Sequence, residues 1–475
     1  MSIEVAVESE RARDPRSRLE SLCDSGSFEA IRSQVRSFRL GERARDGDGV
    51  VGGLGAVDGR PIACYAQDAG YLGGSLGAAH ADTIDRVLQI AERSRIPVVA
   101  VVDSGGARLQ EGIAALGGYS RIFRRNVALS GVVPQISIVG GLAAGGGCYS
   151  PALTDFVVMT RAGAMFLTGP AIVREVTGEE IDVAGLGGPR IHERNGVCDA
   201  VAPDAHAAIS FARSLLRYLP LHAGDEPPRT IGVEPELSDP GVVVPDDPRK
   251  VYDVREAIAG IVDGGSVLEL APRWARNLVT ALARLDGQPV GVIANQPRYS
   301  GGVLDTASAQ KGARFVQTCD RYGIPLLVLV DTPGFMPGAH QEREGVIRFG
   351  ATLVRAFASA TVARVTVVLR KAYGGAYITM NSKDLGADMV FAWPGSELGV
   401  MGARPAVGIV NRRDLAAAED PIAARDELEA DYAARHLSSA TAAAGGFVDE
   451  VIAPAETRAR LIWALSTIGR RRSPR

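Results

Sequence analysis

The chain has 475 residues, of which 46% are hydrophobic and 23% are charged, and its formal net charge is −3. This length exceeds that of one ordinary domain, and the composition is typical of a globular protein with a sizeable core. A slightly acidic chain without a basic surplus argues against a nucleic-acid-binding protein.

The chain ends, the cysteines and the histidines predict a cytoplasmic protein without a metal site. The Glu- and Arg-rich start lacks the apolar stretch of a signal peptide, and no run of about 18 apolar residues could span a membrane. The basic run at residues 470–475 is interpreted as a solvated tail. Neither the five cysteines nor the six histidines have the spacing of metal ligands or of a disulfide framework.

An internal repeat organises the chain. Asp58-Gly59 recurs 228 residues later as Asp286-Gly287. At that offset residues 54–106 align on residues 282–334 without a gap, with nineteen identities in fifty-three positions. Repeats of this length indicate two copies of one domain.

The register of the repeat holds to Tyr149 and Tyr377, and then slips, so that Asp155 matches Asp388. A Pro- and acid-rich stretch at residues 224–249 suits a semi-rigid connector between the copies. The predicted domains are residues 1–235 and residues 236–475.

Each copy has the same predicted elements in chain order. An apolar run without alternation, residues 97–102 or 325–330, has the length and β-branched composition of a strand covered on both faces. A tight polar turn and an amphipathic stretch follow, and then a second apolar strand at residues 134–139 or 362–369. That strand ends in a glycine cluster before a predicted helix. The alternation predicts an α/β layered domain in each half.

The glycine clusters after these strands are the candidate site. In open α/β sheets ligands lie beyond the carboxyl ends of the strands, near helix starts with exposed N–H groups. Because glycine has no Cβ, a substrate can approach the amides closely, and two convergent N–H groups form an oxyanion hole. Such glycines can equally permit only tight turns and close helix packing. Four clusters in register in two copies favour the functional interpretation.

Missing motifs narrow the reaction. The sequence has no Walker loop, no Gly-x-Gly-x-x-Gly fingerprint at the right turn and no Gly-x-Ser-x-Gly elbow. This argues against phosphoryl transfer, dinucleotide chemistry and serine hydrolysis. Two amide-lined holes without an obvious nucleophile suit an enzyme that stabilises developing oxyanions.

The motifs around these turns resemble a known family. Residues 103–112 read Asp-Ser-Gly-Gly-Ala-Arg-Leu-Gln-Glu-Gly, and residues 144–152 read Ala-Gly-Gly-Gly-Cys-Tyr-Ser-Pro-Ala. In the second copy, residues 330–335 read Val-Asp-Thr-Pro-Gly-Phe, and residues 370–377 read Arg-Lys-Ala-Tyr-Gly-Gly-Ala-Tyr. Together they resemble the carboxyltransferase (β) subunits of biotin-dependent acyl-CoA carboxylases, over nearly the whole chain.

The resemblance implies an α/β fold of two tandem crotonase-like domains, in agreement with the internal duplication. It places acyl-CoA mainly on the first domain and biotin on the second. In this family the active site forms between domains of two subunits, which implies a homo-oligomer, commonly a ring-shaped hexamer. The sequence contains neither an Ala-Met-Lys-Met biotinylation motif nor a Gly-rich ATP-binding region. A biotinylated α subunit is therefore the expected partner, with no metal, nucleic acid or membrane involved.

The resemblance also assigns residues by motif. It implies that one set of amides binds the thioester oxygen and another set binds the ureido oxygen of biotin. The implied mechanism needs no protein base: carboxybiotin releases CO2, the biotin nitrogen takes the α-proton, and the resulting enolate attacks CO2. The implied catalytic residues are Gly106, Ala107, Gly146 and Gly147 in the first domain and Gly375 and Ala376 in the second. The implied substrate-binding residues are Gly105, Arg108, Gly145, Gly334, Phe335, Gly374, Tyr377 and Ile378.

Some positions depart from the family pattern. Asp82-Thr83 stands where relatives often carry a lysine near the CoA phosphates, and Gly147 and Ala363 replace a more usual alanine and proline. Ile378 stands where typical propionyl-CoA enzymes have an aspartate. It indicates an acetyl-CoA-using or relaxed enzyme, unless the isoleucine only fills the core.

The expected activity is carboxylation of acetyl-CoA to malonyl-CoA, of propionyl-CoA to methylmalonyl-CoA, or both. Such an enzyme is a ligase that forms C–C bonds, and its products serve fatty acid or polyketide precursor biosynthesis. A biotin-dependent decarboxylase or transcarboxylase subunit would use the same half-reaction and is the alternative enzyme. A non-catalytic assembly subunit is a further alternative, but its amide clusters would be damaged, and here they are intact.

Overall fold

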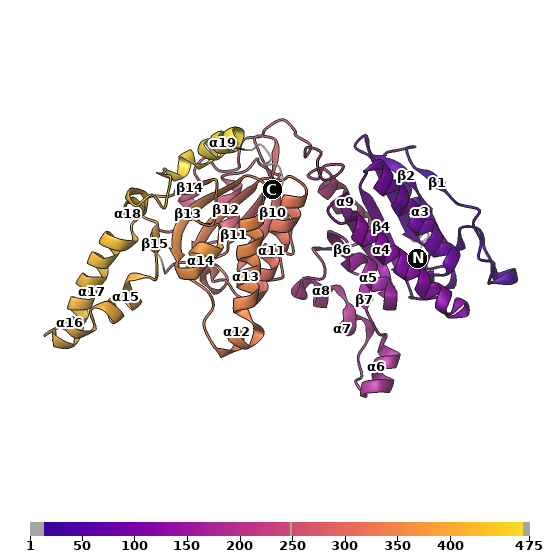
Figure 1. Cartoon of the computed structure of the whole chain (residues 1–475), viewed down its shortest axis with the longest axis horizontal. Coiled ribbons are helices and arrows are strands. Elements are labelled where there is room, and N and C mark those ends of the chain that lie inside the picture. Colours follow the sequence, from indigo (N-terminus) through magenta and orange to yellow (C-terminus); the bar gives the residue numbers. More distant parts are fainter. Residues whose placement is uncertain (1–13, 248, 469–475) are drawn as a thin grey trace, which may run out of the picture. The chain divides into compact units, whose positions relative to one another are not determined.

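A computed structural model describes residues 14–247 and 249–468, and the basic run at residues 470–475 lies outside that range. The chain divides into two compact units, the first ending at Pro227 and the second beginning at Pro228 (Figure 1). This division falls within the connector predicted at residues 224–249. The sequence-based boundary at residue 235 lies a few residues further along the chain.

The first unit is built on a mixed sheet, which has eight strands in the part of the chain described. Its strand order is β1-β2-β3-β4-β5-β6-β8, with β7 paired to β5. The β1–β2 and β2–β3 pairs are antiparallel, and the pairs from β3 onward are parallel. The strands are β1 (Glu29–Ile31), β2 (Val50–Val57), β3 (Arg60–Gln67), β4 (Val98–Ser104), β5 (Gln135–Ala144), β6 (Phe156–Thr160), β7 (Ala164–Phe166) and β8 (Ala200–Ala202).

Helices connect and cover these strands. The α-helices are α2 (Pro15–Leu22), α3 (Ala78–Ser94), α4 (Ile113–Leu129), α5 (Tyr149–Ala152), α6 (Pro170–Thr177), α7 (Val183–Gly187), α8 (Pro189–Asn195) and α9 (Ala205–Leu216). The 3₁₀ helices are η1 (Gly41–Arg43), η2 (Asp46–Gly49), η3 (Leu72–Gly74), η4 (Leu109–Glu111) and η5 (Gly145–Cys148). Apolar residues of α3 and α4, among them Val87 and Ile122, pack with Val98, Ala100 and Val102 of β4 in one core.

The second unit repeats this sheet. Its strand order is β16-β14-β13-β12-β11-β10-β9, with β15 paired to β13, and only the β9–β10 and β10–β11 pairs are antiparallel among those described. The strands are β9 (Leu268–Leu270), β10 (Leu278–Leu285), β11 (Gln288–Asn295), β12 (Leu326–Thr332), β13 (Arg364–Tyr373), β14 (Met389–Ala392), β15 (Glu397–Gly399) and β16 (Glu450–Val451).

The helices of the second unit include a longer insertion after β15. The α-helices are α10 (Val254–Ala259), α11 (Thr306–Arg321), α12 (Ala339–Glu344), α13 (Val346–Ser359), α14 (Gly374–Thr379), α15 (Ala403–Val410), α16 (Arg412–Ala417), α17 (Pro421–Tyr432), α18 (Ser439–Ala444) and α19 (Thr457–Ile468). The short helices are η6 (Pro240–Val243), η7 (Ser300–Gly302), η8 (Ala433–Leu437) and η9 (Pro454–Glu456). The core joins β12 and β13 to α19 through residues such as Leu329, Val367 and Leu461.

The repeated Asp-Gly pairs form the same hairpin turn in both units. Asp58 and Gly59 have φ of 51° and 73°, and Asp286 and Gly287 have the same two values. Two consecutive positive φ angles define the turn that joins twisted antiparallel strands most readily, and Asp-Gly is among its preferred sequences. Asp24 accepts the two N–H groups of the first turn at 3.0 and 2.8 Å. In the second unit Asp263 accepts both at 2.8 Å.

The slip in the sequence repeat has a structural origin. After β5 the chain forms the short 3₁₀ helix η5 and one turn of α5, whereas after β13 it forms the six-residue helix α14. Beyond these helices the copies correspond again. Asp155 accepts the N–H of Gln135, the first residue of β5, and Asp388 accepts that of Arg364, the first residue of β13, both at 2.9 Å. The predicted equivalence of the two aspartates agrees with these contacts.

Candidate active site

The glycine clusters lie at the carboxyl ends of adjacent parallel strands in each unit. In the first unit the turn after β4 lies beside the end of β5, and Ser104 is in register with Ala143 after an irregularity in the ladder. In the second unit Thr332 is in register with Ala372, with the same irregularity. Each unit therefore brings a turn and a helix start together at one edge of its sheet.

The first turn leaves one backbone donor unused. The N–H of Gly105 donates to Gly73 O at 2.8 Å, and that of Arg108 donates to Leu76 O at 2.9 Å. Gly106 has φ of 101°, and its N–H lies 3.3 Å from Ser104 Oγ. Between them, Ala107 N–H donates to no acceptor among the residues described. The turn therefore presents Ala107 N–H for a ligand.

The second part of the first site is η5. Gly145 has φ of 55°, which favours glycine, and Gly146 and Gly147 follow it at the helix start. The first N–H groups of a helix have no partner within the helix. A Cβ on Gly146 would lie 2.9 Å from the ring of Tyr119, so glycine is required there for packing as well as for approach.

Tyr119 and Ser104 lie against this helix start; Ser104 stands in the motif at residues 103–112, whereas no sequence motif marked Tyr119. The hydroxyl groups of Tyr119 and Ser104 are 3.4 Å apart, and a Cβ on Gly147 would lie 3.3 Å from the Tyr119 hydroxyl. Burial raises the pKa of Tyr119 to about 12. The phenol therefore stays protonated near neutral pH and serves as a hydrogen-bond donor rather than a base. Tyr119 lies on the amphipathic helix α4, where the sequence pattern alone would assign an aromatic residue to the hydrophobic core.

The turn of the second unit has the same geometry. Leu304 N–H donates to Gly334 O at 3.0 Å, and Met336 N–H donates to Leu304 O at 2.7 Å. Gly334 has φ of 140°, and no atom lies within 4 Å of a Cβ built on it. Phe335 N–H, the counterpart of Ala107 N–H, donates to no acceptor in the described part of the chain.

Helix α14 completes the second site. Gly374 has φ of 59°, and Gly375 and Ala376 follow it in the first turn, where N–H groups lack intrahelical partners. Gly375 is exposed, and a Cβ on it would lie 3.9 Å from the ring of Phe335. Open space above these amides suits the approach of a ligand oxygen.

A buried charge cluster lies behind the second turn. Asp331, the residue before the turn, is inaccessible to solvent and accepts from Arg370 Nε at 3.0 Å. Lys371 Nζ lies 4.0 Å from the other carboxylate oxygen. Burial raises the pKa of Asp331 and lowers that of Lys371, in each case against the attraction between the two groups. In the sequence, Asp331 and its two basic partners stand in two separate motifs, which the pairing of β12 with β13 brings together.

The side chains of three predicted substrate-binding residues differ in their exposure to solvent. The Arg108 guanidinium is fully buried, where it binds Asp48, Glu111 and the carbonyl oxygen of Ser75, so it does not face solvent in this conformation. Tyr377 is half-buried, and burial raises its pKa. Ile378 is 50% exposed on α14, which leaves it available to a ligand and shows that it does not fill the core.

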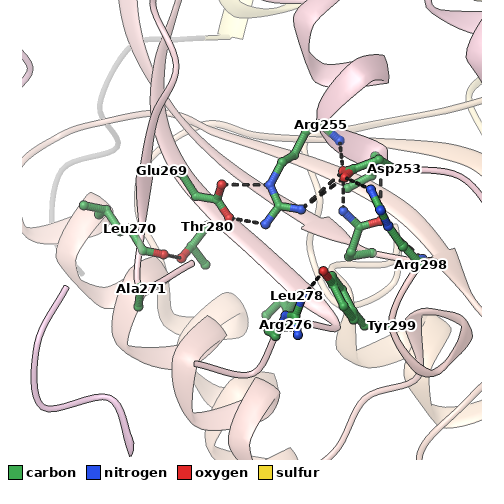
Figure 2. Close-up of polar contacts among 12 residues, drawn as sticks. Asp253, Arg255, Glu269, Leu270, Ala271, Arg276, Leu278, Thr280, Arg298 and Tyr299 are labelled. Carbon is green, nitrogen blue, oxygen red and sulfur yellow. Dashed lines mark hydrogen bonds and ion pairs between the residues drawn. The ribbon is translucent and has the colours of Figure 1, made fainter. Parts of the chain in front are cut away.

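A polar network at the β9–β10 edge of the sheet joins residues before and within α10 to β9 and to the segment that precedes η7 (Figure 2). Arg255 donates to both carboxylate oxygens of Glu269, at 2.8 and 2.6 Å. Arg298 Nη1 forms an ion pair with Asp253 Oδ2 at 3.3 Å. Arg276 lies 3.8 Å from the ring centre of Tyr299, which precedes η7. These contacts hold the segment that leads to Leu304 and so to the second turn.

A family model described as the carboxyl transferase domain matches residues 10–473. The chain belongs to the carboxyl transferase family. It is 46% identical over 473 residues to the propionyl-CoA carboxylase carboxyltransferase subunit of Haloferax mediterranei, covering 96% of this chain and 90% of that protein. It is 44% identical over 470 residues to the methylmalonyl-CoA carboxyltransferase 12S subunit of Propionibacterium freudenreichii subsp. shermanii, covering 97% and 89%.

Among solved carboxyl transferases, the transcarboxylase 12S hexamer with methylmalonyl-coenzyme A and methylmalonic acid bound is similar to this chain. The TM-score is 0.94 at 43% identity, and the match covers 100% of this chain and 93% of that one. The predicted pair of tandem crotonase-like domains is confirmed, as is the prediction of an enzyme of this family.

The described residues were expected to contain neither a metal site nor a membrane-spanning helix. Within residues 14–247 and 249–468, no group of three or more His, Cys, Asp or Glu side chains could hold a metal ion. None of the helices in that part of the chain is long and apolar enough to cross a membrane.

Proposed function

We propose that this chain is the carboxyltransferase (β) subunit of a biotin-dependent acyl-CoA carboxylase. It would transfer a carboxyl group from carboxybiotin to the α-carbon of a short acyl-CoA. The observation that carries the proposal is the pair of amide sites, built alike in both copies of a carboxyl transferase chain. We further propose that residues 1–235 bind acyl-CoA and that residues 236–475 bind biotin.

In the first unit the amides would stabilise the thioester oxygen as it gains negative charge. Ala107 N–H from the turn and the N–H groups of Gly146 and Gly147 from η5 would together bind this oxygen. Removing one donor from such a hole lowers the rate by about 10²–10³. The Tyr119 hydroxyl, protonated near neutral pH, adds a donor close to Gly147.

In the second unit the residues present fit the ureido oxygen of biotin. Gly375 is exposed, and a Cβ on Gly334 would meet nothing within 4 Å, so the turn and the start of α14 leave room for a ligand at the amides of Phe335, Gly375 and Ala376. When bound, carboxybiotin supplies the carboxyl group. The role of the chain is to polarise the ureido oxygen and to orient the ring against Phe335, so that geometry and electrostatics supply the rate.

The subunit would act in a larger assembly. A biotin-carrying α subunit with ATP-dependent biotin carboxylase activity is the partner that this chemistry requires. We also propose a homo-oligomer, for which the hexameric transcarboxylase 12S is the precedent. Apolar side chains that follow the turns are solvent-exposed in the single chain, among them Leu109 at 88%, Ile113 at 81% and Ile347 at 77%. A second copy would cover them.

The acyl group would be acetyl or propionyl. Relatives include the biotin-dependent acetyl-/propionyl-coenzyme A carboxylase beta5 subunit of Mycobacterium tuberculosis, 43% identical over 476 residues and covering 96% of this chain and 87% of that protein. The exposed Ile378, in place of an aspartate, favours a relaxed or acetyl-CoA-using enzyme. The products, malonyl-CoA and methylmalonyl-CoA, would feed fatty acid or polyketide precursors in the cytoplasm.

The test is ATP- and bicarbonate-dependent carboxylation of acetyl-, propionyl- and butyryl-CoA by this chain with a biotinylated α subunit from its own source. Product that requires both this chain and ATP supports the carboxylase and ranks the substrates. Transfer between acyl donors and acceptors without ATP would identify a transcarboxylase instead. No transfer of either kind, despite a formed complex and charged biotin, would refute the catalytic role.

A further inference from the structure

The first unit contains a buried ion cluster directly behind its amide turn. Arg108 Nη1 lies 2.6 Å from Asp48 Oδ1 and 2.9 Å from Glu111 Oε1. Its Nη2 donates to the carbonyl oxygens of Ser75 at 2.9 Å and Asp48 at 3.1 Å. All three ionic side chains are inaccessible to solvent. One guanidinium thus joins the turn to three other segments of the unit.

Glu111 extends these contacts further. Its second oxygen accepts the N–H of Ala78, at the start of α3, at 2.8 Å, and its first oxygen accepts from Ser37 Oγ at 2.9 Å. Burial alone would raise the pKa of Glu111, but the hydrogen bonds from these groups lower it. The carboxylate therefore remains charged beside Arg108 at neutral pH.

The second unit shows that the fold does not need this cluster. Met336 occupies the position equivalent to Arg108, and its N–H still donates to the equivalent carbonyl, Leu304 O, at 2.7 Å. At the start of α11, Gln341 Oε1 accepts Thr306 N–H at 3.0 Å, as Glu111 accepts Ala78 N–H in the first unit, and the N-cap Asp305 accepts Ser308 N–H at 2.8 Å. The second unit thus forms the same turn without a guanidinium at this position, and its own buried ion pair, Asp331 with Arg370, lies on the strands behind the turn.

Because only the first copy has the cluster, it is tied to what the first copy does. Buried ion clusters are weak contributors to stability, since desolvation offsets their attraction, and their best-attested use is to specify one arrangement. The guanidinium lies one residue from Ala107, whose N–H is unused in the described structure. A fixed direction for that N–H is what an oxyanion site requires.

We propose that Arg108, held by Asp48 and Glu111, is a positioning residue that fixes Ala107 N–H for the thioester oxygen. This rests on the proposed carboxyltransferase function and replaces the expectation that Arg108 contacts substrate. The cluster also anchors residues 37–48 to the turn, through Ser37 and Asp48.

The test removes all three charges together, so that no buried charge is left unpaired. The variant Asp48→Asn/Arg108→Met/Glu111→Gln gives the first unit the residue of the second unit at position 108, Met336, and at position 111 a neutral amide like that of Gln341. Asn suits position 48, where φ is 50°. Arg213→Met is the matched control, because Arg213 also ties three segments, donating to Leu22 O at 2.6 Å and to Asp24 and Asp58 at 3.0 Å each, away from the turn.

Two readouts are needed. In the reconstituted carboxylase, the triple variant should lose at least tenfold in kcat for acyl-CoA carboxylation, with the KM for the biotin carrier unchanged. Hydrogen exchange should rise in residues 104–112 and stay unchanged in residues 332–338. The control variant Arg213→Met should keep the parental kcat, even if its melting temperature falls by as much as that of the triple variant.

Either unchanged kcat or unchanged exchange at residues 104–112 in a folded triple variant overturns the proposal. If the triple variant does not fold, Arg108→Lys, which keeps the cation and loses the planar fork, is judged by the same two criteria. If the parent enzyme carboxylates no acyl-CoA, the proposed function fails, while the exchange experiment still decides whether the cluster holds the turn.

Discussion

One methyl group at Gly375 should separate the proposed chemistry from the fold. Gly375 lies in α14, and a Cβ there would come no closer than 3.9 Å to any neighbour, the ring of Phe335. Gly375→Ala should therefore leave stability unchanged or raise it by about 0.4–1 kcal/mol, because alanine has less freedom to lose on folding. The same methyl would stand where a ureido oxygen approaches the amides.

The expected loss in kcat/KM for carboxyl transfer is about 10²–10³, or about 2.7–4 kcal/mol, as for removal of one oxyanion donor. Transfer is measured in the reconstituted complex, and stability is measured by denaturant unfolding of the subunit. Gly408→Ala in α15 is the matched control, since its Cβ would have no atom nearer than 4.0 Å. A stable Gly375→Ala enzyme with at least half of the parental kcat/KM would refute the assignment of the second site.

Three further outcomes are expected. Gly146→Ala should destabilise the first unit by about 1–3 kcal/mol in denaturant unfolding, because its Cβ would meet the Tyr119 ring at 2.9 Å, and in the Tyr119→Ala background the same substitution should cost less than about 0.5 kcal/mol more. Lys311→Met should cost about 3 kcal/mol or more in the same assay, since the Lys311 ammonium donates to three carbonyl oxygens at 2.7–3.0 Å; a loss under 1 kcal/mol would contradict this. His80 has a pKa of about 3 because of burial, so the unfolded chain binds a proton below about pH 6.5 that the native chain does not. Stability should fall by about 1.4 kcal/mol per unit as pH drops from 6 to 4, and His80→Gln should flatten that slope.

The repeat made much of the fold predictable, and its limits were physical. The apolar runs marked β4 and β13 because strands covered on both faces need no alternation. The strand predicted at residues 134–139 continues to Ala144 as β5. Its glycine-rich end stays extended because Leu142 and its neighbours pair with β7, an element that follows the helix start in the chain.

The candidate site was predictable in location and less so in detail. Glycine clusters in register marked the turns, because close approach and positive φ both demand glycine. The sequence could not show that Arg108 is buried, since Asp48 lies sixty residues earlier in the chain. For the same reason Tyr119 was not predicted, because only the folded packing brings its ring against Gly146.

The aspartates that bind the hairpin turns also take part in contacts that close each unit on itself, and such contacts disfavour an exchange of strands between the two similar halves. In the first unit Arg213 of α9, near the end of the unit, donates to Leu22 O at 2.6 Å and to Asp24 at 3.0 Å, near its beginning. In the second unit Arg458 of α19 closes on Asp263 at 2.8 Å. Since each copy carries its own closing contact, the first can finish folding during synthesis, before its near-duplicate leaves the ribosome and competes for the same strand partners.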